Sequence, residues 1–225
     1  MENVSMESLA LAEPKPLVEP PVDAAALAAR LHRRFPGRIT GELVIPAKPA
    51  RHSDFPEELD PRLRAALARR RFAGLYSHQR EAWDLIRAGR HTVVVTPTAS
   101  GKTLCYNLPV LQSALAERAK ALYLFPTKAL SQDQVAEILE FNRAGDLGIR
   151  AFTFDGDTPG DARKAVRTRG DIVVSNPDML HQGILPHHTK WAQFFESLKT
   201  VVIDEMHTYR GVFGSHVANV LRRLR

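Results

Sequence analysis

The chain has 225 residues, of which 44% are hydrophobic and 25% are charged, and this balance predicts a soluble globular protein. It contains no apolar run close to the ~20 residues that a membrane-spanning helix needs. The first 23 residues lack the basic start and apolar centre of a secretory signal. The single cysteine, Cys105, excludes a disulfide framework and a multi-cysteine zinc site within this sequence, and we interpret it as a packed core thiol.

The formal net charge is +6 and the isoelectric point is near 9.7. The charge is uneven, because residues 1–23 hold five acids against one lysine, so the rest of the chain is more basic than the whole. A basic body favours a polyanionic partner such as a nucleic acid, although a solvated basic surface would give the same count.

The N-terminal part divides into two segments by composition. Residues 1–23 hold four prolines among acids and small residues, which is typical of a disordered leader. Residues 24–71 are expected to form a helical extension. Helices are expected near residues 23–34 and 57–70, where leucines recur at helical spacing, and a short strand near residues 39–45.

A phosphate-binding loop is predicted at residues 96–103. An apolar strand at residues 92–95 precedes it and a helix at residues 104–117 follows it, the layout in which backbone N–H groups and a helix N-terminus face a polyphosphate. Lys102 would reach the β- and γ-phosphates, and the Thr103 hydroxyl would bind Mg²⁺.

A second motif supports this interpretation. Residues 200–203 predict a buried strand that ends in Asp204, which would hold Mg²⁺, and Glu205, which would orient and deprotonate water. Alone, each motif has an ordinary alternative: a strand-to-helix turn relieved by Gly101, since Thr96 stands where the general pattern has glycine, or a solvated strand end. The two motifs in this order favour a nucleotide-hydrolysing site.

An adenine-binding group is predicted before the loop. A helix is expected from Ser77, a plausible N-cap, to about residue 89. The Gln79 amide has the geometry to pair with the N6/N7 edge of adenine, and Phe72 or Tyr76 would pack against the base. A surface glutamine at a helix start is the alternative.

Strands and helices alternate through the rest of the chain. Strands are expected at residues 121–125, 149–154, 171–174 and 200–203. The pattern predicts an α/β fold with a mostly parallel sheet covered by helices on both faces. Small hydrogen-bonding residues follow these strands and could contact a nucleic-acid backbone, or simply cap helices.

The motifs in this order resemble the first RecA-like domain of superfamily 2 DExH-box helicases, over residues 72–225. The resemblance identifies Gln79 with the Q motif, residues 98–103 with motif I, 126–130 with motif Ia, 155–158 with motif Ib, 175–180 with motif Ic and 204–207 with motif II. Within the superfamily, residues 176–188 and 209–218 look like MrfA-type bacterial DNA-repair helicases, relatives of the RecQ-like Hrq group.

The resemblance implies an ATP-dependent 3′→5′ DNA helicase of the bacterial cytosol or nucleoid, with ATP and Mg²⁺ as cofactors and single-stranded or partly duplex DNA as partner. It also implies a second RecA-like domain and a four-cysteine zinc domain, which this sequence does not contain. The sequence stops inside an expected helix that begins near residue 211, so we interpret residues 72–225 as a truncated motor domain.

The resemblance also implies the roles of individual residues. The ATP site would comprise Tyr76, Gln79, Thr98, Ala99, Ser100, Gly101, Lys102, Thr103 and Leu104, with Thr103 and Asp204 holding Mg²⁺ and Lys102, Asp204, Glu205 and His207 acting in hydrolysis. The nucleic-acid backbone would lie across Thr127, Lys128, Asp157, Thr158, Ser175 and Asn176.

Three alternatives remain at this point: an RNA helicase of the same superfamily, a small-molecule kinase that binds no polynucleotide, and a hydrolysis-incompetent binding fragment. The tandem His187-His188 is interpreted as a loop feature, not a metal site.

Overall fold

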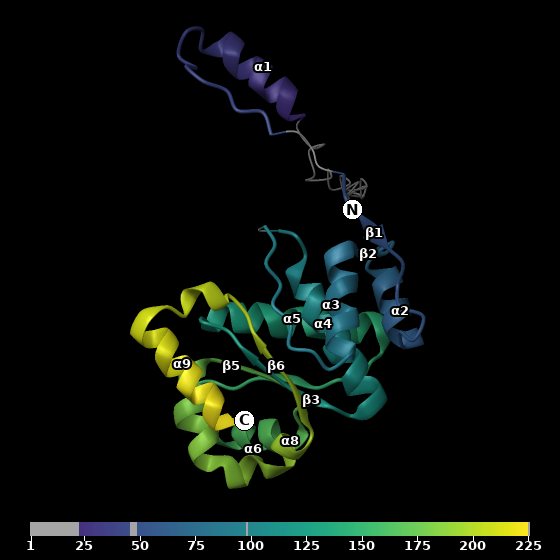
Figure 1. The fold of residues 1–225 in the computed structure, drawn as a ribbon, viewed down its shortest axis with the longest axis vertical. Coiled ribbons are helices and arrows are strands. Elements are labelled where there is room, and N and C mark those ends of the chain that lie inside the picture. Colours follow the sequence, from purple (N-terminus) through teal and green to yellow (C-terminus); the bar gives the residue numbers. More distant parts are fainter. Residues whose placement is uncertain (1–22, 46–48, 98, 225) are drawn as a thin grey trace, which may run out of the picture. The chain divides into compact units, whose positions relative to one another are not determined.

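A computed structural model describes residues 23–45, 49–97 and 99–224 (Figure 1). The predicted disordered leader therefore lies outside the described residues except for Asp23, and so does Thr98 of the phosphate loop. The chain divides into two compact units, Met1–Pro49 and Ala50–Arg225.

The first unit contains one helix, α1 (Ala24–Arg34), among its described residues. The Asp23 carboxylate caps it by accepting a hydrogen bond from Ala25 N at 3.1 Å. The strand predicted at residues 39–45 is wrong: these residues form no strand, Leu43, Val44 and Ile45 are largely exposed, and no other strand lies among the described residues of this unit.

The second unit holds all the strands that the structure describes. Its elements are β1 (His52–Ser53), α2 (Pro61–Arg69), β2 (Leu75–Tyr76), α3 (Ser77–Arg87), α4 (Lys102–Glu117), β3 (Lys120–Leu124), α5 (Lys128–Gly145), β4 (Ala151–Thr153), α6 (Gly160–Arg169), β5 (Ile172–Ser175), α7 (Pro177–Met179), η1 (Leu180–Ile184), η2 (Leu185–Trp191), α8 (Ala192–Glu196), β6 (Leu198–Ile203), η3 (Met206–Thr208) and α9 (Gly211–Leu224).

Four parallel strands form the main sheet in the order β4-β5-β3-β6, which confirms the predicted α/β fold. Alternate residues of β3 face opposite sides. Tyr123 packs with residues of α2–α5, whereas Leu122 and Leu124 pack with residues of α6, η1, η2, α8 and α9. Figure 1 shows the strands between these two groups of helices. Both faces of β3 and β5 are buried, and this explains why these two strands are apolar runs without alternation.

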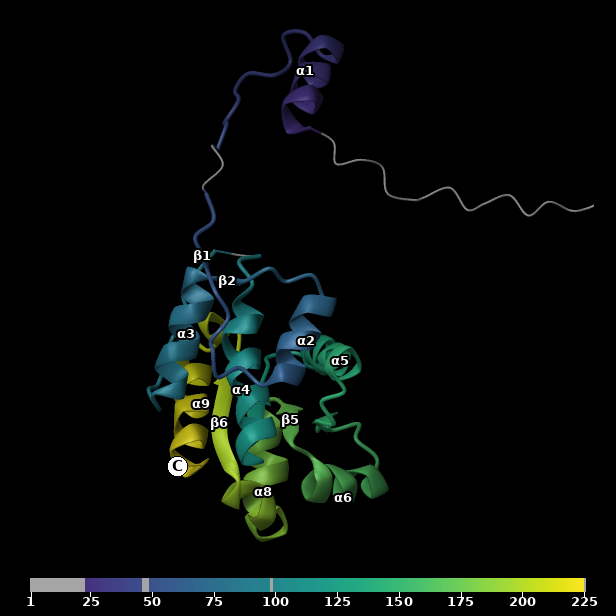
Figure 2. The ribbon, with the colours of Figure 1, turned by 90° about the vertical axis from the view of Figure 1, so that its right-hand side faces the viewer.

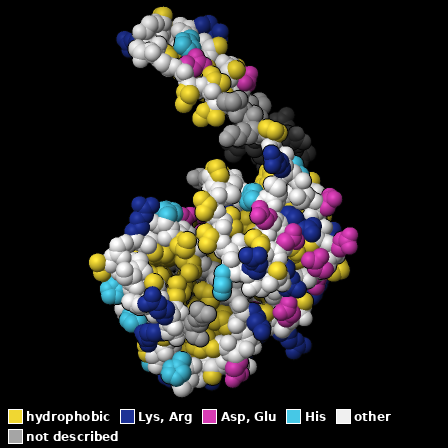
Figure 3. All heavy atoms as spheres, viewed as in Figure 1, with side chains coloured by type: hydrophobic (Ala, Val, Ile, Leu, Met, Phe, Trp, Pro, Cys, Tyr) yellow, Lys and Arg dark blue, Asp and Glu magenta, His cyan; other side chains and the backbone are white. Residues whose placement is uncertain are grey.

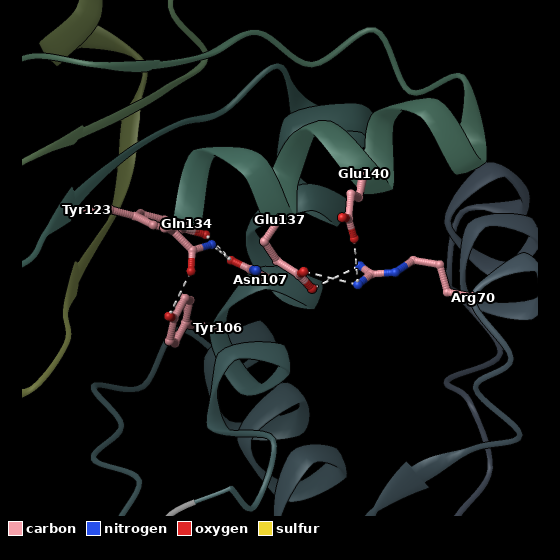
Figure 4. Close-up of polar contacts among 7 residues, drawn as sticks. All are labelled: Arg70, Tyr106, Asn107, Tyr123, Gln134, Glu137 and Glu140. Atoms are coloured by element: carbon pink, nitrogen blue, oxygen red, sulfur yellow. Dashed lines mark hydrogen bonds and ion pairs between the residues drawn. The ribbon is translucent and has the colours of Figure 1, made fainter. Parts of the chain in front are cut away.

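Helix α2 belongs to the main core, although the sequence placed the start of this domain at residue 72. Leu63 and Leu67 are fully buried against the same cluster as Phe141 of α5. Arg70, just after α2, donates to both carboxylate oxygens of Glu137 at 2.9 and 3.0 Å (Figure 4). These contacts explain why the compact unit begins near Ala50.

The strand predicted at residues 92–95 is also wrong in this structure. The segment forms no strand, and Val93 and Val95 are 70% and 88% exposed. Strand β6 is consequently an edge of the described sheet, lying between α4 and α9 (Figure 2). Its Val201 is 37% exposed, and hydrophobic side chains gather on this face (Figure 3). A β-branched run needs a partner strand to form a ladder, and residues 92–95 have none among the described residues.

Gly145 permits the close approach of α5 to α2. A Cβ atom at this position would lie 2.8 Å from the Arg62 carbonyl oxygen and 2.6 Å from Leu147 Cδ2. We predict that Gly145→Ala lowers the free energy of unfolding by about 1–3 kcal/mol, because the backbone oxygen cannot move cheaply. Urea denaturation checks this. Gly160→Ala is the control, since a Cβ there meets nothing within 4 Å, and equal stability of the two variants would contradict the prediction.

Candidate nucleotide and nucleic-acid site

The ends of the parallel strands place the motifs along one edge of the sheet. Leu124 at the end of β3 pairs with Ser175 at the end of β5 and with Ile203 at the end of β6. The residues that follow these strands therefore leave the sheet at the same edge, as ligand sites of open α/β sheets do. Asp204 is one of them, and its backbone N donates to Leu124 O at 3.1 Å.

The phosphate loop has the backbone of an anion cradle. Ala99 and Gly101 both have left-handed φ angles, of 59° and 75°, and α4 begins directly afterwards at Lys102. Lys102 Nζ donates to the carbonyl oxygens of Thr96 and Pro97 at 3.0 and 3.2 Å, so the ammonium folds over the loop. Backbone N–H groups in such a turn and the N-terminus of a 16-residue helix together favour a bound phosphate.

Gln79 is a structural support of this loop. It is only 5% exposed, and its amide accepts from Tyr76 N at 2.8 Å and donates to Gly101 O at 2.9 Å. A Cβ atom on Gly101 would lie 2.7 Å from Gln79 Nε2, so glycine is required there. Tyr76, not Ser77 as predicted, is the N-cap of α3. The adenine role of Gln79 stays a prediction.

The Tyr76 ring lies beside the loop on an aromatic cluster. It stacks on His78 with ring centroids 5.8 Å apart, and it lies 5.1 Å from the His52 ring. His78 also hydrogen-bonds the Ser100 carbonyl oxygen at 3.0 Å. A partly exposed ring at this position suits packing against a nucleobase.

The motif after β6 presents its carboxylates in a constrained turn. Asp204 Oδ1 accepts from Glu205 N at 2.8 Å, and Glu205 has a left-handed φ of 49°. Glu205 Oε2 lies 3.1 Å from His207 Nδ1. A non-glycine residue in this conformation stores strain, which persists where the surroundings hold it.

Sequence reasoning missed Tyr106, which joins the two motifs. Its hydroxyl donates to Asp204 Oδ2 at 2.9 Å, so the first turns of α4 lie against Asp204. Burial, followed by the negative charge of Asp204 and the hydrogen bond to it, raises the pKa of Tyr106 well above its usual range, and the nearby Thr103 side chain opposes the shift. The available signal was its position three residues after Thr103, on the same face of a helix.

Thr103 and Asp204 are oxygen donors of the kind that Mg²⁺ prefers. This ion keeps several waters and takes few protein ligands beside substrate phosphates, so one hydroxyl and one carboxylate fit it. Elsewhere in the described part of the chain, no group of three or more His, Cys, Asp or Glu side chains could hold a metal, and His188 of the tandem pair instead lies 3.2 Å from the Leu185 carbonyl oxygen.

Two of the predicted nucleic-acid residues cap helices at the same edge. Thr127 caps α5 by accepting from Leu130 N at 3.3 Å, and Asn176 caps α7 by accepting from Met179 N at 2.7 Å. Ser175 is only 1% exposed and its hydroxyl donates to Phe154 O, so its side chain is not presented to a ligand in this structure.

The other predicted contacts are Lys128, the first residue of α5, and two residues of the loop after β4, Asp157 and Thr158. Lys128 forms an ion pair with Asp157, and both side chains are exposed. The Thr158 hydroxyl accepts from Asp155 N at 2.9 Å, which closes the loop. Arg163, which sequence reasoning missed, also stabilises this loop by donating to Thr158 O at 2.8 Å and to Asp155 O at 3.3 Å.

None of the helices in the described ranges is long and apolar enough to cross a bilayer.

Residues 76–225 match the family model described as DEAD/DEAH box helicase. The chain belongs to this family. YprA of Bacillus subtilis, described as an uncharacterized ATP-dependent helicase, is 58% identical over 182 residues, covering 80% of this chain and 24% of that protein. The ATP-dependent helicase hrq1 of Schizosaccharomyces pombe is 41% identical over 197 residues, covering 85% of this chain and 18% of that protein.

A solved structure shows the same relationship. The DUF1998 helicase MrfA bound to DNA and AMPPNP aligns with a TM-score of 0.77 and 57% identity, over 79% of this chain and 25% of that one. The predicted RecA-like fold and the resemblance to MrfA-type and Hrq-group helicases are confirmed. The chain spans about a quarter or less of the length of these relatives.

Cys105 offers a test of how tightly the first turn of α4 is packed. Burial raises the pKa of its thiol to about 11, and the side chain is almost fully enclosed. We predict that a thiol reagent at pH 8 labels the native chain very slowly and the urea-unfolded chain rapidly, because the thiolate is the reactive form. Absorbance of the released chromophore gives both rates. Rapid labelling of the native chain would show that this turn is open.

Proposed function

We propose that this chain is the ATP-binding motor domain of an ATP-dependent DNA helicase that moves 3′→5′ and acts in DNA repair in the bacterial cytosol or nucleoid. The observation that carries the proposal is the Tyr106–Asp204 hydrogen bond, because it holds the helix of the phosphate loop against the motif II carboxylate. The similarity to MrfA, whose structure contains DNA and AMPPNP, supports DNA as the partner.

The ATP site is assigned to the phosphate loop and to Tyr76 and Gln79, which lie beside it. Tyr76 and Gln79 would receive the adenine, while backbone N–H groups of residues 98–104 would cradle the phosphates. Lys102 Nζ, which donates to two loop carbonyls in this structure, would exchange them for β- and γ-phosphate oxygens. Thr103 and Asp204 would hold Mg²⁺.

Hydrolysis is assigned to the residues after β6. Bound Mg-ATP would supply the phosphoryl group and the metal charge that favours its transfer to water. Glu205, which has a left-handed backbone, would orient the attacking water and take its proton. His207 Nδ1 lies 3.1 Å from that carboxylate. His207 would couple the state of the γ-phosphate to the residues that contact the nucleic acid. Fast turnover would need a second RecA-like domain that supplies an arginine finger.

The DNA strand is assigned to exposed and partly exposed residues of the neighbouring turns. Thr127, Lys128, Asp157, Thr158 and Asn176 would contact sugar and phosphate without reading bases. The Lys128–Asp157 ion pair would have to open, or shift, for the ammonium to reach a phosphate. Of Ser175, only the backbone would take part, because its side chain is buried.

The role of Lys102 can be tested by removing its side chain. We predict that Lys102→Ala weakens binding of Mg-AMPPNP by about 1.5–3 kcal/mol, the range for hydrogen bonds to charged groups. A fluorescence titration measures the change. Lys164→Ala is the control, because this exposed lysine of α6 removes the same charge far from the loop in sequence. Equal affinities of the two variants would contradict the assigned role.

The partner can be tested by competition. We predict that single-stranded DNA displaces a labelled single-stranded DNA from the chain more effectively than RNA of the same sequence, and that binding weakens as salt rises, because the contacts are to phosphates. Anisotropy measures both. A preference for RNA would favour the RNA helicase alternative, and no polynucleotide binding at all would favour a small-molecule kinase.

A further inference from the structure

A chain of side-chain hydrogen bonds runs from Asp204 into the core below the phosphate loop, and Figure 4 shows its inner part. The Tyr106 hydroxyl lies 2.9 Å from Asp204 Oδ2 and 3.2 Å from Gln134 Oε1. Gln134 Nε2 donates to Asn107 Oδ1 at 2.9 Å, and Tyr123 donates to the same oxygen at 3.0 Å. Asn107, Tyr123 and Gln134 are all buried.

The Tyr106 hydroxyl has one hydrogen and two acceptors within reach. It can satisfy Asp204 or Gln134 fully, but not both at once. A tyrosine hydroxyl keeps its hydrogen at neutral pH, so the group is a donor. The direction of the hydrogen therefore depends on how strongly Asp204 competes for it.

Asn107 holds the Gln134 amide in one orientation. Its Oδ1 accepts from both Gln134 Nε2 and the Tyr123 hydroxyl, while its buried Nδ2 has no hydrogen-bond partner in the described part of the chain. Because the nitrogen of the Gln134 amide is bound to Asn107, its oxygen faces Tyr106. Gln134 Oε1 is therefore a fixed alternative acceptor for the Tyr106 hydrogen.

Gln134 connects this network to the helix whose N-terminus carries two of the proposed nucleic-acid contacts. It lies on α5, whose N-cap Thr127 and first residue Lys128 are exposed. Further along α5, the ion pair between Glu137 and Arg70 anchors the helix (Figure 4). A change in the hydrogen bonds of Gln134 would therefore be felt in the part of α5 between its exposed N-terminus and the Glu137–Arg70 ion pair.

We propose that Tyr106 is a positioning residue that couples the nucleotide site to nucleic-acid binding through Gln134. When Asp204 turns toward bound Mg-nucleotide, the Tyr106 hydroxyl rotates and donates to Gln134 Oε1. When Asp204 is released, the hydroxyl donates to Asp204 again and Gln134 Oε1 loses this donor. The inference rests on the proposed function, because it joins the two sites assigned there.

The test compares AMPPNP affinities with and without a saturating single-stranded DNA oligonucleotide, in the presence of Mg²⁺, on the full chain. The oligonucleotide should change the wild-type Kd by at least ~5-fold, the lower end of usual couplings, and AMPPNP should change the DNA affinity by the same factor. Tyr106→Phe keeps the ring that packs edge-on against Tyr123 and should abolish the coupling, as should Gln134→Leu.

Tyr209→Phe is the matched control, because it removes a buried hydroxyl that has no hydrogen-bond partner in the described ranges and should keep the coupling. Circular dichroism melting checks that each variant is folded. If both ligands bind but do so independently in the wild type, or if Tyr106→Phe couples them as the wild type does, the inference is wrong and the proposed function stands. Failure of the wild type to bind AMPPNP would overturn the proposed function itself.

Discussion

The parallel pairing of β3 with both of its neighbours determines where the candidate functional groups lie. Because the ends of β3, β5 and β6 are in register, the turns that follow them leave the sheet at one edge. The same register sends alternate residues of β3 into two separate cores. A slip by one residue would exchange these faces, so the packing of the helices also fixes the positions of the turns.

Local signals were enough to predict the α/β fold and several of the elements that carry the candidate site. Apolar runs marked β3 and β5, which are buried on both faces, and also the edge strand β6. Thr127 and Asn176 marked helix starts because their side chains satisfy backbone N–H groups of the next turn. The start of α4 followed from Gly101 and Lys102, since an anion loop needs a left-handed residue before its helix.

Sequence reasoning failed where strand formation or side-chain burial depends on contacts with residues far away in the sequence. Residues 92–95 have strand composition but no partner ladder here. The packing of α2 on α5 did not follow from the sequence, because Arg70 and its partner Glu137 lie 67 positions apart. The burial of the Ser175 side chain was not foreseen either, because its hydroxyl donates to the carbonyl oxygen of Phe154, which follows the neighbouring strand β4. Tyr106 was missed, because only the fold brings it to Asp204.

The candidate site differs from the rest of the described fold in having strained backbone outside the ends of helices. Among the described residues, five that are not glycine have positive φ angles, and three of them directly follow helices, where left-handed caps are common: Arg71, Arg118 and Asp146. The other two, Ala99 and Glu205, stand in the phosphate loop and after β6. Neighbouring side chains hold both segments: Gln79 donates to the carbonyl oxygen of Gly101, two residues after Ala99, and Asp204 Oδ1 accepts from Glu205 N. Since strain persists only where it is held, the chain itself shapes both halves of the site before any ligand arrives.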